Sequence, residues 1–379
     1  MGLPMSEHWR VGRDPAQPIR IFANVNAGSF GDFVSSLFVV NSIADRFDHK
    51  ILTVMYRNDR DYKREMLRLL STDHIIEIPE SVSFPSIDIL NPYDPVITDA
   101  ALVPWFKGGN AWQDIFVSGA MAGSSYLWAF DRLHYLRVPD PDAVACTDEL
   151  VKRGLNPDRW FCTIHAREPG YYSKTNQQNL RDCDPNVYWH LAVHVAKQLG
   201  GQVVRLGHPA MTVFPAMDGL VDLSRETGNS FLQAFAISRS RFFLGGPSGP
   251  SAVADAFNVP NGILDAVDYH PSNDGMVMRT IDLVTPDGKL YRQEALFEAG
   301  FYKMAILKLL ASRQGYRVFK NGAEEAIRLA NHLHQMTADI AGWRSAASPD
   351  PRPRPNQFSW PPGKPQPRGS FLPIAAATP

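Results

Sequence analysis

The sequence predicts an α/β protein with two Rossmann-like domains and a disordered, proline-rich tail. Its 379 residues exceed the size at which one hydrophobic core stops growing, so we expect two domains. Apolar strand segments alternate with helical segments from residue 19 and again from residue 160. Ten of the thirty prolines fall in the last 34 residues, which hold few large apolar groups. The predicted boundaries are 1–140, 141–345 and 346–379.

The first domain opens with a βαβαβ pattern, which is typical of a parallel, doubly wound sheet. A buried strand is followed by the turn Gly28–Asp32 and an apolar helix. A second strand, a helix with its apolar residues on one side and a third strand complete the pattern. The predicted ranges are Ile19–Val25, Phe33–Phe47, Lys50–Met55, Asp59–Leu70 and His74–Ile78.

Residues 79–136 break this alternation because they are rich in proline, glycine and aromatic side chains. We expect loops and helices here, and a linker over Arg137–Cys146. The aromatic side chains either pack in the core or line an acceptor pocket, since sugars stack on aromatic rings, and core packing is the favoured alternative. They are Trp105, Phe106, Trp112, Tyr126 and Trp128.

The second domain repeats the alternation. Asp184 and Pro185 are suited to be the N-cap and first residue of a helix with apolar residues at every fourth position. A hairpin is indicated by the turn Thr285–Gly288. The other predicted elements are strands Trp160–His165, Gln202–Leu206, Arg241–Leu244 and Asn261–Leu264 and helices Ser230–Ser238, Ala252–Phe257 and Glu324–Met336.

Composition excludes several classes of protein. The net charge is −1 and 20% of residues are charged, so no basic field invites nucleic acid. Three cysteines without CxxC spacing indicate neither a disulfide framework nor a zinc site, and a reducing cytoplasm fits best. No signal peptide or transmembrane segment is expected, although a peripheral contact with a membrane surface is compatible with the sequence.

Two features of the second domain suit a diphosphate. The glycine-rich turn Gly245–Ser251 connects a strand to a helix, where backbone N–H groups and the helix dipole hold phosphate and Ser248 adds a hydroxyl. His165 and Arg167 follow the first strand at the edge where open α/β sheets bind ligands. Arg167 can grip a phosphate with two hydrogen bonds, and His165 is either a further donor or a structural residue. Arg181 is either a second cation for the phosphates or a solvated loop residue.

These blocks carry a resemblance to known proteins. The segment His165–Tyr171 reads H-x-R-E-x-G-Y, and the segment FLQAFAISRSRFFLGGPSGPSAVADAFNVP follows it in order. Together they resemble a bacterial family of putative glycosyltransferases, and more distantly they are similar to the heptosyltransferases and fucosyltransferases of the two-domain GT-B fold. The resemblance covers roughly residues 160–268, and loosely the helix near residue 325.

The resemblance implies roles for particular residues. The arginine of the HxR pair contacts the donor diphosphate in such families, which corresponds to Arg167, and the turn of small residues corresponds to Ser248 and Gly249. Gly207 and His208 are implied to border the nucleotide base. This chain departs from the pattern at Gln233, where relatives often have an acidic residue, so no role of that acid carries over.

Asp32 is the candidate catalytic residue. The segment Gly28–Asp32 resembles the G-x-x-G-D turn of heptosyltransferases, whose aspartate deprotonates the acceptor hydroxyl. Inverting transfer needs such a base. The structural alternative is that Asp32 caps the helix that follows, and the two roles are compatible.

The predicted function is sugar transfer from a nucleotide-diphosphate sugar to a glycan, lipid-linked or protein acceptor, with a hexosyl or deoxyhexosyl group moved. No DxD pair follows a strand, and Asp140–Asp142 resembles a linker, so we expect an inverting, metal-independent enzyme without a cofactor. Two alternatives stay open. One is a nucleotide-sugar 2-epimerase, and the other is a non-catalytic sugar-binding protein, which would be favoured if Asp32 were buried and Arg167 paired internally.

Overall fold

The computed structural model describes residues 16–25, 27–79, 115–118, 134–169, 179–267, 276–301, 303–313, 315–344 and 370–371. The chain divides into two compact units, unit 1 (Met1–Leu136) and unit 2 (Arg137–Pro379). Each is described by itself below. Within the described ranges, no helix combines the length and the hydropathy that crossing a bilayer requires.

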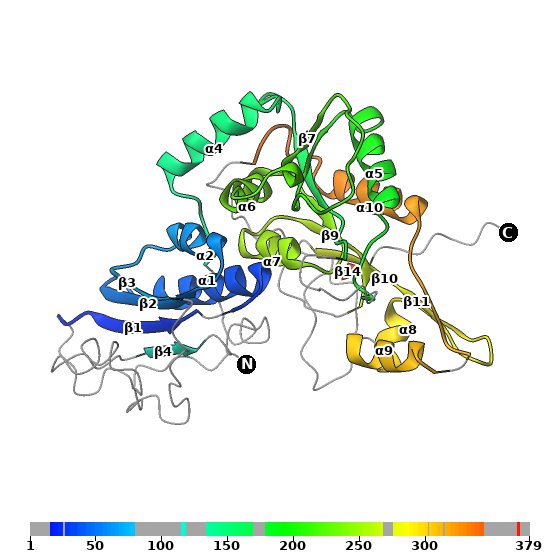
Figure 1. Cartoon of the computed structure of the whole chain (residues 1–379), viewed down its shortest axis with the longest axis horizontal. Coiled ribbons are helices and arrows are strands. Elements are labelled where there is room, and N and C mark those ends of the chain that lie inside the picture. Colours follow the sequence, from blue (N-terminus) through cyan, green and yellow to red (C-terminus); the bar gives the residue numbers. More distant parts are fainter. Residues whose placement is uncertain are drawn as a thin grey trace. The chain divides into compact units, whose positions relative to one another are not determined.

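Unit 1 contains a parallel sheet with the strand order β3-β2-β1-β4. Its strands are β1 (Ile19–Asn24), β2 (Lys50–Asn58), β3 (His74–Pro79) and β4 (Ile115–Ser118). Figure 1 shows helices α1 (Phe30–Ala44) and α2 (Asp61–Met66) on the same face of this sheet. The predicted βαβαβ start is confirmed. β4 was not predicted, and the aromatic cluster expected between residues 105 and 128 lies outside the described residues.

Helix α1 begins three residues earlier than predicted, and Ser29 is its N-cap. The Ser29 hydroxyl accepts a hydrogen bond from the Asp32 backbone N–H at 3.2 Å, while it donates to the Asp32 carboxylate at 2.5 Å. Ser29 therefore caps the helix through its side chain, and Asp32 occupies the third helical position, where its carboxylate accepts from the Ser29 hydroxyl. The prediction that Asp32 itself could be the N-cap is therefore wrong.

Two further predictions in this part of the chain need correction. The expected helix Asp59–Leu70 is split into α2 and a short 3₁₀ turn over Leu67–Leu69. The expected linker over Arg137–Cys146 is mostly the first half of helix α4 (Asp140–Lys152). Asp140-Pro141-Asp142 forms the first turn of α4, where proline has no hydrogen bond to lose and acidic side chains favour the positive end of the helix.

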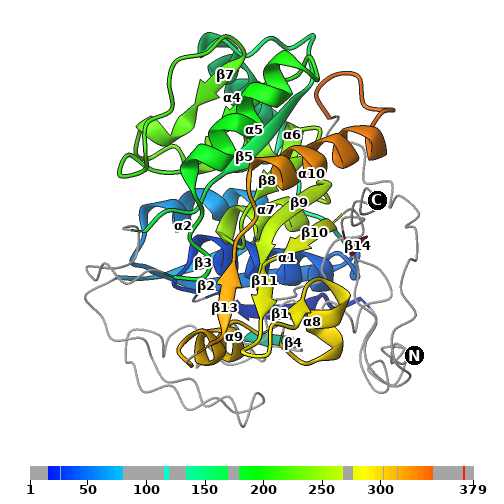
Figure 2. The same ribbon diagram turned by 90° about the vertical axis from the view of Figure 1, so that its right-hand side faces the viewer.

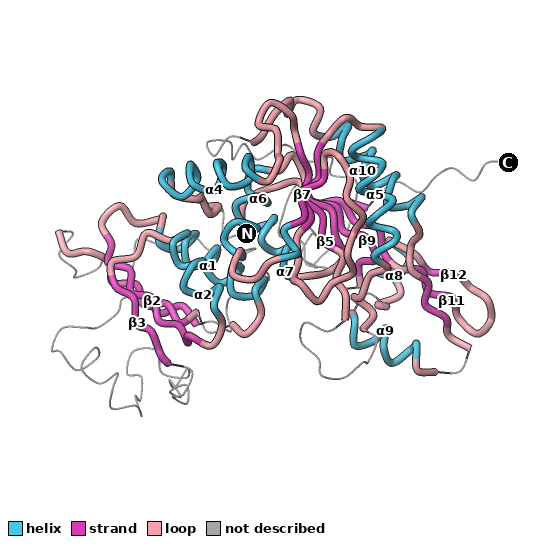
Figure 3. Tube along the Cα trace, turned by 45° about the horizontal axis from the view of Figure 1, so that its top comes forward, coloured by secondary structure: helices cyan, strands magenta, loops and turns pink. Residues whose placement is uncertain are grey.

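Unit 2 is built on a seven-stranded sheet with the order β14-β10-β9-β8-β5-β6-β7, in which all pairs are parallel. Figure 3 shows helices α5 and α10 on one face of this sheet and α6 and α7 on the other. The strands are β5 (Phe161–His165), β6 (Gln202–Arg205), β7 (Leu220–Asp222), β8 (Phe243–Gly245), β9 (Asn261–Ala266), β10 (Met276–Thr280) and β14 (Ser370–Phe371). The helices are α5 (Pro185–Lys197), α6 (Ser230–Arg239), α7 (Gly249–Ala256) and α10 (Ala323–Met336).

The hydrophobic core of unit 2 explains why α5 and α10 pack on the same face of the sheet. The predicted N-cap is confirmed, because the Asp184 carboxylate accepts from the Asn186 N–H at 2.9 Å. Leu191 and Val195 of α5 are buried with Leu329 and Leu333 of α10 and with the strands beneath. Both helices therefore cover one face because their apolar stripes recur at helical spacing.

A small appendage continues from β10. It is a three-stranded antiparallel sheet with the order β12-β11-β13, beside helices α8 (Glu294–Glu298) and α9 (Met304–Ala311), as Figure 2 shows. The predicted hairpin turn is present between β11 (Asp282–Val284) and β12 (Leu290–Tyr291), where Gly288 has a φ of 84°. The third strand, β13 (Arg317–Phe319), was not predicted.

Part of the proline-rich tail differs from the prediction. Ser370 and Phe371 form β14, which pairs in parallel with Val277 and Met278 of β10. The other tail residues that were expected to be disordered lie outside the described residues.

Candidate functional site

The candidate site of unit 2 lies at the carboxyl ends of β5 and β8. The chain runs from β5 outward to β6 and β7, and then returns to β8, β9 and β10 on the opposite side of β5. The strand order thus reverses between β5 and β8, which are paired. A reversal of this kind opens a crevice at the carboxyl edge of a parallel sheet, and it is where such folds bind their ligands.

His165 and Ser248 meet at this reversal. His165 is the last residue of β5, and its Nδ1 lies 3.0 Å from the Ser248 hydroxyl. The pKa of His165 is lowered from 6.5 to about 3, mainly because the ring is buried and further because His208, Arg205 and Arg167 are near. The ring is therefore neutral at physiological pH, with one donor and one acceptor nitrogen.

Ser248 also begins helix α7 as its N-cap residue. Its side chain does not cap the helix, because its hydroxyl is engaged with His165. Gly249 is the first helical residue, not part of the preceding turn as predicted. The positive end of α7 is consequently directed to the sheet edge without a side-chain cap, which suits an anionic ligand.

The glycines of the turn are required by close packing. A Cβ on Gly246 would overlap the Cys183 sulfur, and a Cβ on Gly245 would lie 2.6 Å from the Phe243 ring. The segment that contains Arg181 and Cys183 therefore packs directly on the glycine turn, and the Arg181 carbonyl is 3.7 Å from that Gly246 Cβ position.

The two predicted arginines lie on that segment and on the β5 loop. Arg167 has its Nε 3.6 Å from an Asp182 carboxylate oxygen, and its carbonyl accepts from the Cys183 N–H at 2.7 Å. The Nε of Arg181 is buried and has no hydrogen-bond partner among the described residues. The Nε atoms of Arg205 and Arg292 are likewise buried without a hydrogen-bond partner among the described residues, and a ligand, ion or water can complete a donor of this kind.

Gly207 and His208 follow β6 at the same edge of the sheet. Gly207 has a φ of 146°, and a Cβ there would overlap the Met211 sulfur. Gln233 holds this peptide from both sides, because its Oε1 accepts from the Gly207 N–H and its Nε2 donates to the Gly207 carbonyl, each at 2.9 Å. Gln233, noted only as a departure from the family pattern, thus fixes the loop that leads to His208.

Arg205 is a central residue that the sequence analysis missed. Its side chain is fully buried at the end of β6, where it pairs with Asp222 at 3.2 Å and Glu168 at 3.4 Å. Its guanidinium carbon lies 3.7 Å from the centre of the Phe214 ring. Glu168 also accepts from the Thr212 backbone N–H and hydroxyl. An arginine inside an otherwise apolar strand was the signal for this buried network.

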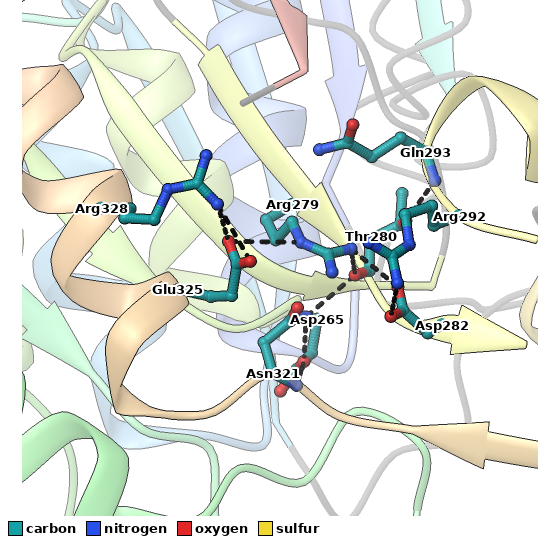
Figure 4. Close-up of polar contacts among 9 residues, drawn as sticks. All are labelled: Asp265, Arg279, Thr280, Asp282, Arg292, Gln293, Asn321, Glu325 and Arg328. Atoms are coloured by element: carbon teal, nitrogen blue, oxygen red, sulfur yellow. Dashed lines mark hydrogen bonds and ion pairs between the residues drawn. The ribbon is translucent and has the colours of Figure 1, made fainter. Parts of the chain in front are cut away.

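A second polar network lies at the carboxyl end of β9 (Figure 4). Asp265 is the extra residue of a β-bulge, since its neighbours Leu264 and Ala266 pair with consecutive residues of β10, and it has a φ of 57°. Its Oδ1 accepts from the backbone and side-chain N–H groups of Asn321, and burial raises its pKa. Nothing in the sequence pattern predicted this network.

Asp32, the candidate base, belongs to unit 1. It is exposed, and its carboxylate accepts from Ser29. The turn before it is anchored because the Tyr62 hydroxyl donates to the Gly28 carbonyl at 3.2 Å and the Tyr62 ring packs edge-on against Phe30. The structure thus presents a fixed, exposed carboxylate at the first turn of α1.

Comparisons with known proteins show the fold. No protein-family model and no curated protein sequence matches this chain. A family 9 glycosyltransferase from Veillonella parvula superposes with a TM-score of 0.53 at 11% identity, covering 84% of this chain and 98% of that one. E. coli ADP-heptose LPS heptosyltransferase II gives a TM-score of 0.48 at 16% identity over 84% and 100% of the two chains.

A weaker likeness exists to UDP-GlcNAc 2-epimerase from Neisseria meningitidis, with a TM-score of 0.35 at 9% identity over 84% of this chain and 100% of that one. The superposition on the family 9 glycosyltransferase supports the predicted glycosyltransferase fold, whereas the narrower family and the link to fucosyltransferases stay predictions. The chain has the mixed α/β fold, with parallel sheets, of the GT-B glycosyltransferases.

Proposed function

We propose that this protein is a glycosyltransferase that moves a sugar from a nucleotide-diphosphate donor to an acceptor hydroxyl. The observation that carries the proposal is the group of anion-binding features at the reversal of strand order in unit 2. Three features lie at that edge: the His165–Ser248 pair, the start of α7 without a side-chain cap, and the buried Nε of Arg181, which has no partner in the described part of the chain. Each of them suits a diphosphate.

In this proposal Arg167 binds the donor diphosphate. Its Nε lies 3.6 Å from an Asp182 carboxylate oxygen, so a phosphate would compete with this carboxylate for the guanidinium. Gly207 and His208 border the nucleotide base. The arginines and the α7 dipole stabilise the leaving diphosphate, in place of a metal ion.

Asp32 is proposed as the base that deprotonates the acceptor. Its exposure fits this role, because a general base has to reach an incoming hydroxyl. Direct attack by that hydroxyl on the anomeric carbon inverts its configuration. Asp32 belongs to unit 1, whereas the proposed donor-binding residues belong to unit 2.

The non-catalytic alternative would be favoured by two observations together, and only one of them is present. Arg167 has an internal acidic partner, but Asp32 is exposed where this alternative expects it to be buried. The three candidate functions differ in what happens to the nucleotide sugar. A binding protein leaves the nucleotide sugar intact, a transferase hydrolyses it slowly or transfers the sugar, and an epimerase changes the sugar while it stays on the nucleotide.

The test is a thermal-shift panel with ADP, UDP, GDP and their sugar conjugates, followed by nucleotide release from any conjugate that binds. A ligand that binds only the folded protein raises its melting temperature. Arg167→Ala should weaken binding about 10- to 150-fold, equivalent to about 1.5–3 kcal/mol for a charge-assisted contact.

Arg159→Ala is the matched control, because Arg159 bonds the Gly200 and Gly201 carbonyls at the opposite end of the sheet. Its ligand-induced shift should equal that of the wild type. Absence of both binding and nucleotide release across the panel would refute the proposed function, and equal affinity of folded Arg167→Ala would remove Arg167 from the site.

A further inference from the structure

Helix α9 on the appendage has an apolar composition that its position does not explain. Seven of its eight residues, MAILKLLA, are apolar, and a helix apolar on all sides ordinarily lies inside a core. Only Leu307 and Leu310 are buried. Ile306 is 37% exposed and Leu309 is 54% exposed, and they share one side of the helix because they are three positions apart. The outer face of α9 therefore lacks a cover within this chain as described.

The charged residues on and beside α9 are mostly positive. Lys303, Lys308 and Arg313 are exposed there, and Arg317 and Lys320 follow further along the chain, whereas exposed Glu298 ends α8. The sequence from residue 299 to residue 322 contains these five basic residues and no acidic one, in a protein whose net charge is −1. A surface that pairs exposed apolar side chains with a local excess of cations suits an anionic and partly apolar partner.

The appendage holds α9 in a defined place. Leu307 and Leu310 pack with Leu283 of β11 in a separate small core. The appendage is tied to the large sheet by the network of Figure 4, in which Asp265 of β9 binds Asn321 beyond β13. Arg279 of β10 adds an ion pair with Asp282 of β11 at 2.9 Å. These contacts fix the buried side of α9 and leave its outer side available.

We propose that the outer face of α9 docks on an anionic membrane surface. Ile306 and Leu309 would enter the boundary between headgroups and acyl chains, while Lys303, Lys308 and Arg313 lie near the lipid phosphates. A second copy of the same face fits poorly because it would oppose these positive charges with three more. A nucleic acid would match the charges but would leave Ile306 and Leu309 uncovered. This inference does not depend on the proposed enzymatic activity.

The test is co-sedimentation of the full chain with vesicles of phosphatidylcholine alone and of phosphatidylcholine with 30% phosphatidylglycerol. Binding is expected only to the anionic vesicles, and it should weaken with salt because the Debye length shortens. Leu309→Asp should lower the partition coefficient at least tenfold, since it places a negative charge at the membrane boundary. Lys308→Ala should lower it about fivefold, which corresponds to about 1 kcal/mol per basic residue near the surface.

The matched control uses α4, where Val144 is 63% and Val151 is 40% exposed. Four acidic residues accompany them on that helix, so Val151→Asp should leave vesicle binding unchanged. Leu309→Gln gives a second, uncharged variant, and circular dichroism establishes that each variant is folded.

Three outcomes overturn the proposal. The first is that the wild type does not bind anionic vesicles, and the second is that folded Leu309→Asp and Leu309→Gln bind them as tightly as the wild type. The third is that Val151→Asp loses as much vesicle binding as Leu309→Asp. A fourth is a wild-type dimer, detected by light scattering, that Leu309→Asp converts to a monomer without any vesicle binding. That result would assign the face to a protein interface.

Discussion

The side chains of His165 and Ser248 join β5 to α7 through one hydrogen bond of 3.0 Å, across the point where the strand order of unit 2 reverses. When the serine hydroxyl donates this hydrogen bond, Nδ1 of His165 has to be unprotonated to accept it, so the imidazole has to be neutral. The low pKa of His165, caused chiefly by burial, meets this requirement at physiological pH.

The same shift predicts a pH dependence of stability. Between pH 6.5 and about 3 the unfolded His165 binds a proton that the folded one does not, so the free energy of unfolding falls as the pH falls through this window. The contribution has a slope of up to about 1.4 kcal/mol per pH unit. Urea unfolding from pH 7 to pH 4 should show a smaller slope for His165→Gln than for the wild type, and parallel slopes would contradict the assignment.

Position 233 should require an amide side chain, which can both accept from and donate to the Gly207 backbone. Glutamate can accept from the Gly207 N–H but cannot donate to the Gly207 carbonyl, so Gln233→Glu leaves a carboxylate against a carbonyl oxygen. We expect a loss of about 1–3 kcal/mol in the free energy of unfolding at pH 7, measured in urea. The loss should diminish at pH 4, where the carboxyl is partly protonated. A stable Gln233→Glu at pH 7 would show that the clamp is dispensable.

Arg205 and Glu168 should be energetically coupled. Glu168→Gln removes one of the two acidic partners of a fully buried guanidinium, which we expect to cost about 2 kcal/mol of stability. In an Arg205→Met background the same change should cost under about 0.5 kcal/mol, because the guanidinium that Glu168 pairs with is absent. Urea unfolding of the four proteins completes this double-mutant cycle, and additive losses would argue against the coupling.

Two variants distinguish the catalytic role proposed for Asp32 from the capping of α1 by Ser29. Asp32→Asn keeps an oxygen that accepts from Ser29 but removes the proton acceptor, so stability should hold while turnover falls about 10²-fold or more. Ser29→Ala removes the cap itself and should cost about 1 kcal/mol of stability with a much smaller loss of turnover. Donor turnover and the melting temperature are measured for both variants. Near-normal turnover in Asp32→Asn would limit the role of Asp32 to its contacts with Ser29 at the start of α1.

Asp265 should tolerate asparagine better than leucine. Asparagine keeps the acceptor oxygen for Asn321 and readily adopts a positive φ, whereas leucine does neither. Because burial raises the pKa of Asp265, the folded protein holds this proton to a higher pH than the unfolded chain, and its stability falls as the pH rises above 3.8. Asp265→Asn should therefore gain stability relative to the wild type between pH 4 and pH 8 in urea unfolding, and an unchanged difference would contradict this.

Periodicity and turn chemistry predicted most of the regular elements. The α5 helix, with its cap at Asp184 and its apolar stripe, satisfies local rules that can be recognised without any knowledge of the tertiary structure. α4 was missed because Asp-Pro-Asp is typical both of linkers and of a first helical turn, and only packing decides between them. β10 and β13 were missed because short strands depend on partners that are distant in the sequence.

The same contrast holds for the site. Strand-end position pointed to His165 and Ser248 separately, but their hydrogen bond joins residues 83 positions apart. The Arg205 and Asp265 networks were missed because a buried charge is identified by the groups around it. A bulge such as the one at Asp265 depends on the register between two strands, which composition does not encode.

The pairing of β14 with β10 has a consequence for the order in which unit 2 can be completed. Among the described residues, β10 gains its second neighbour from Ser370–Phe371, a segment that leaves the ribosome after α8, α9 and α10. Until then its unpaired N–H and C=O groups form an open edge to which another nascent chain could add a strand. Pairing of Ser370–Phe371 with β10 thus covers this edge late in synthesis and limits misassembly between growing chains.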